Sequence, residues 1–282
     1  MIKVKASNAQ EYNIPVEIKE WKFPAGESGI QFKCNWHEPI DKFCISLRFE
    51  SNDDLINLLL LVDAIRAEYG ANIKLHLNIE YFPYARQDRV MCQGQSHSLR
   101  VIVGLIRSCK FSSILVVDPH SDVLESLFPA GELTVFKQVE AIEYSSVFQK
   151  YLAKAKSDIP TYLVSPDEGA SKKIYKIAEK YGLPVIRASK KRNPATGQIV
   201  ETVVEDIGIG DTVVRLLVVD DIIDGGRTFI ELAKVLLKTY NIERLGLWAS
   251  HGIFSQGRDV LSDYDDIDVF NDISNTEKQK KD

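Results

Sequence analysis

Residues 216–228 read Leu-Leu-Val-Val-Asp-Asp-Ile-Ile-Asp-Gly-Gly-Arg-Thr, and this stretch decides the fold. Its four leading apolar residues predict a fully buried strand, and a helix is predicted to open near Thr228. In open α/β sheets, ligands bind at the carboxyl ends of the strands. Glycines in such a turn let backbone N–H groups approach an anion, and the N-terminus of the following helix favours phosphate.

Two aspartates, Asp220 and Asp221, are predicted to stand where that strand ends. Their negative charge suits ribose hydroxyls or a bridging Mg²⁺ rather than the phosphate itself. An acid pair beside a phosphate-binding turn therefore indicates a sugar phosphate as the ligand. The alternative is a strand–turn–helix corner whose two aspartates are only solvated.

The composition is that of an ordinary globular protein, with 45% hydrophobic and 27% charged residues in a chain of 282. A net charge of −5 argues against nucleic acid as the main partner, because a phosphate backbone calls for a basic face. The apolar run at residues 55–65 is too short to span a bilayer, so we expect no membrane partner. Four cysteines without metal-binding spacing, and no secretory signal, predict reduced thiols in a cytoplasmic protein.

Strands and helices are predicted to alternate along most of the chain, which is typical of α/β domains with parallel sheets. Residues 1–50 predict short strands, with a turn at residues 23–27. Further strands are expected at residues 73–79, 113–117, 161–165, 184–188, 213–219 and 244–250, and helices at 52–69, 99–108, 141–155, 171–181 and 228–240. We place the boundary between two domains after residue 133, so that they comprise residues 1–133 and 134–282.

Three more polar segments follow predicted strands. Residues 81–89 read Tyr-Phe-Pro-Tyr-Ala-Arg-Gln-Asp-Arg, and residues 118–122 read Asp-Pro-His-Ser-Asp. Residues 190–192, Lys-Lys-Arg, open a basic segment that on its own predicts no more than a solvated turn.

These segments, together with residues 23–27, 164–170 and 250–255, occur in the order typical of ribose-phosphate pyrophosphokinases, also called PRPP synthetases. The chain resembles that family over nearly its whole length. The most specific segment is residues 81–89, whereas the acid pair and glycine turn are shared with type I phosphoribosyltransferases. The resemblance implies two tandem phosphoribosyltransferase-like (type I) α/β domains, each with a mainly parallel sheet flanked by helices. In this arrangement, the last residues of the chain are candidates to pack back against the N-terminal domain.

The resemblance also implies an activity. A ribose-phosphate diphosphokinase transfers pyrophosphate from Mg-ATP to the 1-hydroxyl of ribose 5-phosphate, which gives PRPP and AMP. The implied cofactor is Mg²⁺, and the implied assembly is a homo-oligomer, either a dimer or a hexamer. One alternative is a phosphoribosyltransferase that uses PRPP, although it leaves residues 81–89 unexplained. A second is a non-catalytic regulatory subunit resembling the same family.

Site residues follow from the same resemblance. Lys190 and Arg192 match the catalytic basic loop, where cations close on charge that develops at the transferred group. His120 and Asp167 match the metal ligands, with Asp118 and Asp122 as nearby rivals. A lone His120 would more simply be a hydrogen-bonded loop histidine.

Two larger sets of residues are implied to bind the substrates. Those implied for ATP are Phe23, Glu27, Arg86, Gln87 and Asp88. Those implied for ribose 5-phosphate are Asp220, Asp221, Asp224, Gly225, Gly226, Arg227 and Thr228. In the family, the loop that Phe23 and Glu27 match reaches the adenine of a neighbouring subunit. Ala25 and Arg227 depart from the usual pattern, which puts purine selectivity and the detail of the phosphate loop in question.

Overall fold

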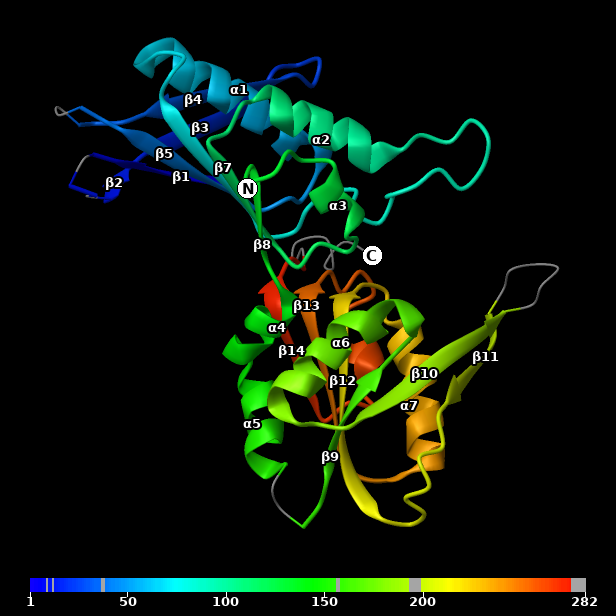
Figure 1. Ribbon diagram of the computed structural model, residues 1–282. Coiled ribbons are helices and arrows are strands. Elements are labelled where there is room, and N and C mark those ends of the chain that lie inside the picture. Colours follow the sequence, from blue (N-terminus) through cyan, green and yellow to red (C-terminus); the bar gives the residue numbers. More distant parts are fainter. Residues whose placement is uncertain (9, 12, 37–38, 156–157, 193–198, 275–282) are drawn as a thin grey trace. The chain divides into compact units, whose positions relative to one another are not determined.

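The computed structural model describes residues 1–8, 10–11, 13–36, 39–155, 158–192 and 199–274. The chain divides into two compact units, Met1–Phe136 and Lys137–Asp282. This division falls three residues after the predicted boundary. Within the described residues each unit holds its own six-stranded sheet (Figure 1).

Unit 1 is built on a mixed sheet. Its strands are β1 (Ile2–Ser7), β2 (Asn13–Pro15), β5 (Lys42–Leu47), β6 (Lys74–Ile79), β7 (Ser113–Val117) and β8 (Leu133–Phe136). They lie in the order β2-β1-β5-β6-β7-β8. Strands β5 to β8 are parallel, whereas β1 runs antiparallel to both β2 and β5. Strands β3 (Glu17–Lys22) and β4 (Ser28–Lys33) form a separate hairpin.

Helices cover one face of the sheet in unit 1 (Figure 1). These are α1 (Asn52–Tyr69) and α2 (Ser98–Ser108), while the short helix α3 (Val123–Ser126) follows β7. A capping box between Ser51 and Asp54 starts α1, which stops at Gly70. The strands bury every second residue beneath these helices, such as Phe43 and Leu77.

Unit 2 is built on a mainly parallel sheet. Its strands are β9 (Thr161–Ser165), β10 (Val185–Arg192), β11 (Ile199–Val204), β12 (Val213–Ile223), β13 (Asn241–Gly252) and β14 (Asp266–Asp272). They lie in the order β11-β10-β9-β12-β13-β14, and only β11 is antiparallel to its neighbour. The central strand β12 is therefore the one that carries the acid pair.

The helices of unit 2 are α4 (Gln138–Ala141), α5 (Ser146–Lys154), α6 (Glu168–Tyr181) and α7 (Arg227–Thr239), with 3₁₀ turns η1 (Ile142–Tyr144) and η2 (Asp259–Leu261). Helix α7 shares a core cluster with Leu216 and Val218 of β12. Leu217 instead lies beside Tyr151 of α5, since both would touch a Cβ added at Gly246. Alternate residues of β12 therefore face different helices, as expected for a parallel strand buried on both sides.

Most predicted elements are present, but several limits were wrong. The helix predicted at residues 141–155 is broken into three pieces, because the Ser145 hydroxyl accepts a bond from the Phe148 amide (3.0 Å) and starts a new helix. Strand β12 continues to Ile223, since Asp220 still pairs with Ala249. Strand β10 continues to Arg192, so the basic segment begins in a strand rather than a loop.

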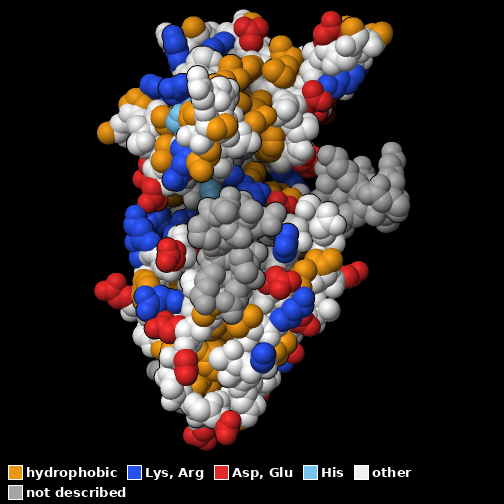
Figure 2. Space-filling view, turned by 90° about the vertical axis from the view of Figure 1, so that its right-hand side faces the viewer, with side chains coloured by type: hydrophobic (Ala, Val, Ile, Leu, Met, Phe, Trp, Pro, Cys, Tyr) orange, Lys and Arg blue, Asp and Glu red, His pale blue; other side chains and the backbone are white. Residues whose placement is uncertain are grey.

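The described part of the chain contains no helix with the length and apolar character that a bilayer crossing requires. Figure 2 shows acidic and basic side chains interspersed over the visible face of unit 2. Hydrophobic side chains gather on unit 1 in the same view.

Candidate active site

The acid pair lies in the last third of β12. Asp220 and Asp221 are both half-buried. The Asp220 carboxylate accepts a hydrogen bond from the Asp221 amide at 2.9 Å. Burial, and then the neighbouring Asp221 carboxylate, raise the pKa of Asp220 well above its usual value. Such a site favours a ligand that donates hydrogen bonds or brings positive charge, which sugar hydroxyls and a metal ion both do.

Two side chains from other elements fix this part of β12. The buried Gln138, in the first turn of α4, donates a hydrogen bond to the Asp220 carbonyl at 2.7 Å. Lys173 of α6 lies with its Nζ 3.9 Å from a carboxylate oxygen of Asp221. The acid pair is thus held by backbone and charge contacts on the side of α4 and α6.

The turn after β12 places the start of α7 beside the acid pair. Gly226 has φ of 79°, and a Cβ there would lie 3.1 Å from Val260 and 3.2 Å from Leu261. Both the backbone conformation and the close packing therefore require glycine. The amides of Phe229 and Ile230 donate to the Gly226 carbonyl at 2.9 Å, so the helix begins there. Its first N–H groups are those that a phosphate would meet.

A second loop packs against the glycine turn. Residues 253–258 follow β13, and the Ser255 hydroxyl lies 3.6 Å from where a Cβ of Gly225 would be. Arg258 lies over the ring of Phe254, 4.0 Å from its centroid, and donates to Asp272 at 2.8 Å. This loop therefore packs against the glycine turn. Arg227 is exposed.

His251 has a structural environment. It is 1% exposed, and its Nδ1 lies 3.3 Å from the Asn271 amide nitrogen on β14. His251 therefore contributes to the packing between β13 and β14.

Asp167 lies at the carboxyl end of β9, next to β12 in the sheet. Its carboxylate caps α6 by accepting a bond from the Ala170 amide at 3.2 Å. Its negative charge also contributes to the raised pKa of Asp220. Asp167 and the acid pair therefore belong to one acidic region at the carboxyl edge of this sheet.

In unit 1, two of the predicted segments meet at the carboxyl ends of β6 and β7. The Asp88 carboxylate accepts bonds from Arg89 at 2.8 and 2.9 Å and from the Ser121 hydroxyl at 2.6 Å. These bonds hold the pKa of Asp88 well below its usual range, with the Arg89 bonds as the larger cause. Asp88 therefore links residues 81–89 to residues 118–122 through its hydrogen bond from Ser121.

The remaining predicted residues of these segments differ in their exposure to solvent. Arg86, Gln87 and His120 are exposed, whereas Asp118 is buried. Asp118 has φ of 28°, an uncommon conformation for a residue with a side chain, and its amide donates to the Phe136 carbonyl at 2.8 Å.

Phe23 and Glu27 lie in the turn between β3 and β4, and both are exposed. The ring of Phe23 packs edge-on against Trp21, with centroids 6.1 Å apart. An ion pair of 2.8 Å from Lys22 to Asp53 ties this turn to α1. The hairpin thus presents an aromatic ring and a carboxylate at its tip.

The backbones of Lys190 and Arg192 lie in β10, paired with β11, and the register shifts between Lys191 and Arg192. Their side chains, and residues 193–198, lie outside the described part of the chain. Within the described residues, no three His, Cys, Asp or Glu side chains group as a metal site would require. Metal binding through His120 and Asp167 thus stays a prediction.

Three supporting residues were not predicted from the sequence: Gln138, Lys173 and Ser121. Each acts on a site residue through a contact between segments distant in the chain.

A parallel-sheet unit with an acid pair on its central strand, followed by a glycine turn at a helix start, is a phosphoribosyltransferase-type domain. The family model of the phosphoribosyl transferase domain matches residues 137–280. The model of the N-terminal domain of ribose phosphate pyrophosphokinase matches residues 6–109.

Curated relatives agree with these matches. A ribose-phosphate pyrophosphokinase from Pyrococcus furiosus is 32% identical over 244 residues, which cover 86% of this chain and 79% of the relative. One from Mycoplasmopsis pulmonis is 32% identical over 238 residues, which cover 82% of this chain and 68% of the relative. The chain belongs to the ribose-phosphate pyrophosphokinase family.

A solved structure supports the fold. The phosphoribosylpyrophosphate synthetase from Mycobacterium smegmatis aligns with a TM-score of 0.66 and 21% identity, covering 84% of this chain and 73% of that one. The predicted fold class and family are confirmed, and with the family the prediction that the chain is an enzyme. The N-terminal match also separates the chain from phosphoribosyltransferases, which the second unit alone would allow.

Proposed function

We propose that this chain synthesises PRPP, by transferring pyrophosphate from Mg-ATP to the 1-hydroxyl of ribose 5-phosphate with release of AMP. PRPP synthesis is the activity after which its curated relatives are named. The observation that carries the proposal is the acid pair of β12 beside the glycine turn of α7, in a chain that also has the N-terminal domain of the family. A sugar-phosphate site and a nucleotide-binding unit are both needed for this transfer.

Ribose 5-phosphate would lie along the end of β12. Asp220 and Asp221 accept hydrogen bonds from ribose hydroxyls, because the oxygen atoms of both carboxyl groups can act as acceptors. The turn from Asp224 through Gly225 and Gly226 to Thr228 receives the 5-phosphate with its backbone N–H groups. The exposed Arg227 adds a cation at the rim of this turn.

The transfer itself needs alignment and charge neutralisation more than covalent chemistry by the protein. Lys190 and Arg192 supply positive charge to the transferred group as its bond to the α-phosphate oxygen breaks. Mg²⁺, held by Asp167 and His120 together with phosphate and water oxygens, would neutralise charge on the ATP phosphates. Two protein ligands suffice for this ion, since Mg²⁺ usually keeps several waters and substrate oxygens.

The nucleotide would be bound by unit 1. Arg86 and Gln87, both exposed beyond β6, can meet phosphate and the polar edge of adenine. Asp88, which is already bonded to Arg89 and Ser121, holds this segment in shape rather than binding ATP directly. Phe23 and Glu27 would reach the adenine of a neighbouring copy, so the working enzyme is a homo-oligomer. The cytoplasmic location stays a prediction.

The proposal is tested by mass spectrometry of the products formed from ATP, ribose 5-phosphate and Mg²⁺. We expect PRPP and AMP in equal amounts. ADP with a bisphosphorylated sugar would instead show transfer of a single phosphoryl group. No turnover by a folded, Mg²⁺-supplied protein would favour the non-catalytic subunit. Nucleotide formation from PRPP and a base, without ATP, would favour a phosphoribosyltransferase.

Replacing both Asp220 and Asp221 by Asn tests the proposed sugar site separately from the other proposed sites. A hydrogen bond to a charged group is worth about 1.5–3 kcal/mol, so the loss of even one such bond should raise KM for ribose 5-phosphate by roughly tenfold or more. The matched control, Asp211→Asn with Asp259→Asn, removes the same charge from residues outside the site and should leave KM unchanged. An unchanged KM in the acid-pair variant would remove these residues from the sugar site.

A further inference from the structure

The part of β12 that carries the acid pair is paired with a strand on one side only. Within the described sheet of unit 2, β9 pairs with β12 as far as Val218, whereas β13 pairs with it as far as Ile223. Asp220 and Asp221 therefore lie beyond the last residue of β12 that β9 reaches. Because buried backbone groups need partners, other parts of the chain have to fix the backbone here.

One peptide group joins the two aspartates, and it is hydrogen-bonded at both ends. Its carbonyl, which belongs to Asp220, accepts the bond from Gln138 at 2.7 Å. Its N–H, which belongs to Asp221, donates to the Asp220 carboxylate at 2.9 Å. Rotation of this peptide would carry the N–H away from the carboxylate, which would then lose a bond that orients it. The bond from Gln138 therefore also controls the direction of the Asp220 side chain.

The backbone of α4 fixes the position of Gln138. The Glu140 carboxylate accepts a bond from the Lys137 amide at 2.7 Å, and the Ala141 amide donates to the Lys137 carbonyl at 2.9 Å. The orientation of the Gln138 amide follows from its partner, since a carbonyl oxygen can only accept and Nε2 must face it. Gln138 thus presents its donor from a hydrogen-bonded turn.

Stability alone gives little reason for a glutamine at this position. Gln138 is 3% exposed, and its Oε1 is buried without a hydrogen-bond partner in the described part of the chain. An unpaired buried acceptor is destabilising. An apolar side chain of similar size would remove this cost together with the favourable bond to Asp220. These two effects on stability oppose each other, so the bond to Asp220 calls for a role in the site.

We propose that Gln138 is a positioning residue for the binding of ribose 5-phosphate. By holding the Asp220 carbonyl, it keeps the Asp221 amide against the Asp220 carboxylate and so aims this carboxylate at the ribose hydroxyls. Gln138 acts through Asp220 and need not touch the sugar. Asp221 has separate support, since Nζ of Lys173 lies 3.9 Å from its carboxylate. This inference rests on the proposed function, because it requires that the acid pair binds the sugar.

Isothermal titration calorimetry of the full chain with ribose 5-phosphate, and separately with Mg-ATP, tests this role without requiring turnover. Gln138→Met should raise the Kd for ribose 5-phosphate roughly fivefold or more, the size of one weakened hydrogen bond, and leave the Kd for Mg-ATP unchanged. The free energy of unfolding in urea should change little, because the bond and the unpaired oxygen are lost together. Gln138→Leu is a second variant with the same expectation. A purely structural role would instead lower the stability and leave both Kd values unchanged.

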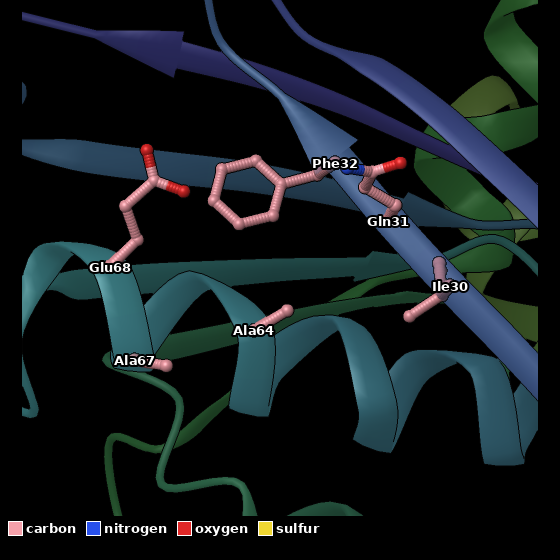
Figure 3. Close-up of a pocket in the computed structure, with 6 residues that line it drawn as sticks. All are labelled: Ile30, Gln31, Phe32, Ala64, Ala67 and Glu68. Carbon is pink, nitrogen blue, oxygen red and sulfur yellow. The ribbon is translucent and has the colours of Figure 1, made fainter.

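Two glutamines serve as matched controls. Gln149 of α5 donates the same kind of bond, to the Glu143 carbonyl at 3.0 Å. Gln31 lines a depression of about 450 Å³ between α1 and β4 in unit 1, together with Ile30 and Phe32 (Figure 3). Gln149→Met and Gln31→Met should both bind ribose 5-phosphate as wild type does.

A double-variant cycle tests whether Gln138 acts through Asp220. Adding Gln138→Met to Asp220→Ala should change the Kd for ribose 5-phosphate by less than about twofold, whereas adding it to Asp221→Ala should keep the full effect. A wild-type Kd in Gln138→Met, or an equal effect of Gln138→Met with and without Asp220→Ala, would overturn the positioning role alone. Absence of ribose 5-phosphate binding by the wild type would overturn the proposed function, and the positioning role with it.

Discussion

Gly225 and Gly226 look equivalent in the sequence, but the structure predicts different responses to alanine. At Gly226 the positive φ of 79° costs a residue with a Cβ about 1–2 kcal/mol. Contacts of 3.1 and 3.2 Å with Val260 and Leu261 add about 1 kcal/mol, because both neighbours must shift. Reduced freedom of the unfolded chain returns about 0.5 kcal/mol. The net loss for Gly226→Ala is therefore about 2 kcal/mol.

Gly225→Ala is the matched control. Its Cβ would meet Ser255 and Gln256 at 3.6 and 3.7 Å, which are ordinary contact distances. We expect a change within about 0.5 kcal/mol, since alanine there meets neither strain nor overlap. Urea unfolding, followed by fluorescence at fixed protein concentration, measures both free energies. Equal stabilities of the two variants would refute the reasoning.

Three further outcomes are expected. Arg244 and Lys150 bind Asp266 and lower its pKa to about 2, so the stability it contributes is present above pH 4 and is lost as the pH falls towards 2. Asp266→Asn should thus cost at most about 2 kcal/mol at pH 7, and a urea series showing an unchanged gap at pH 3 would contradict this. Lys190→Ala should lower kcat at least about a hundredfold with ribose 5-phosphate KM nearly unchanged, whereas Lys234→Ala should change neither, as steady-state assays can show. Chelation of Mg²⁺ should abolish PRPP formation, and added Mg²⁺ should restore it in the same assay.

Local patterns predicted the elements that carry clear periodicity. The helix at residues 52–69 and the strands at 113–117 and 161–165 have the limits that their patterns indicated. Strand β11 was not predicted, because its residues depend on pairing with β10 rather than on their own alternation. The break at Ser145 was missed for a related reason, since one hydroxyl bond decides it.

Residues of the site could be predicted from the sequence only where a local motif is typical of a particular ligand. The acid pair and glycine turn predicted a sugar phosphate, and the structure shows why replacing Gly226 is destabilising. The bond from Gln138 to the Asp220 carbonyl joins residues 82 positions apart, and no local pattern could reveal it. Likewise, Asp88 carries a family motif, yet its bonds to Arg89 and Ser121 indicate a bracing role.

The position of Gln138 has a consequence for communication along the chain. Unit 2 starts at Lys137, and the very next side chain is bonded to the backbone of Asp220. The first residues of unit 2 are thereby hydrogen-bonded to the strand that would hold the pentose. A change in the backbone at Lys137 would therefore reach the strand of the acid pair after a single residue.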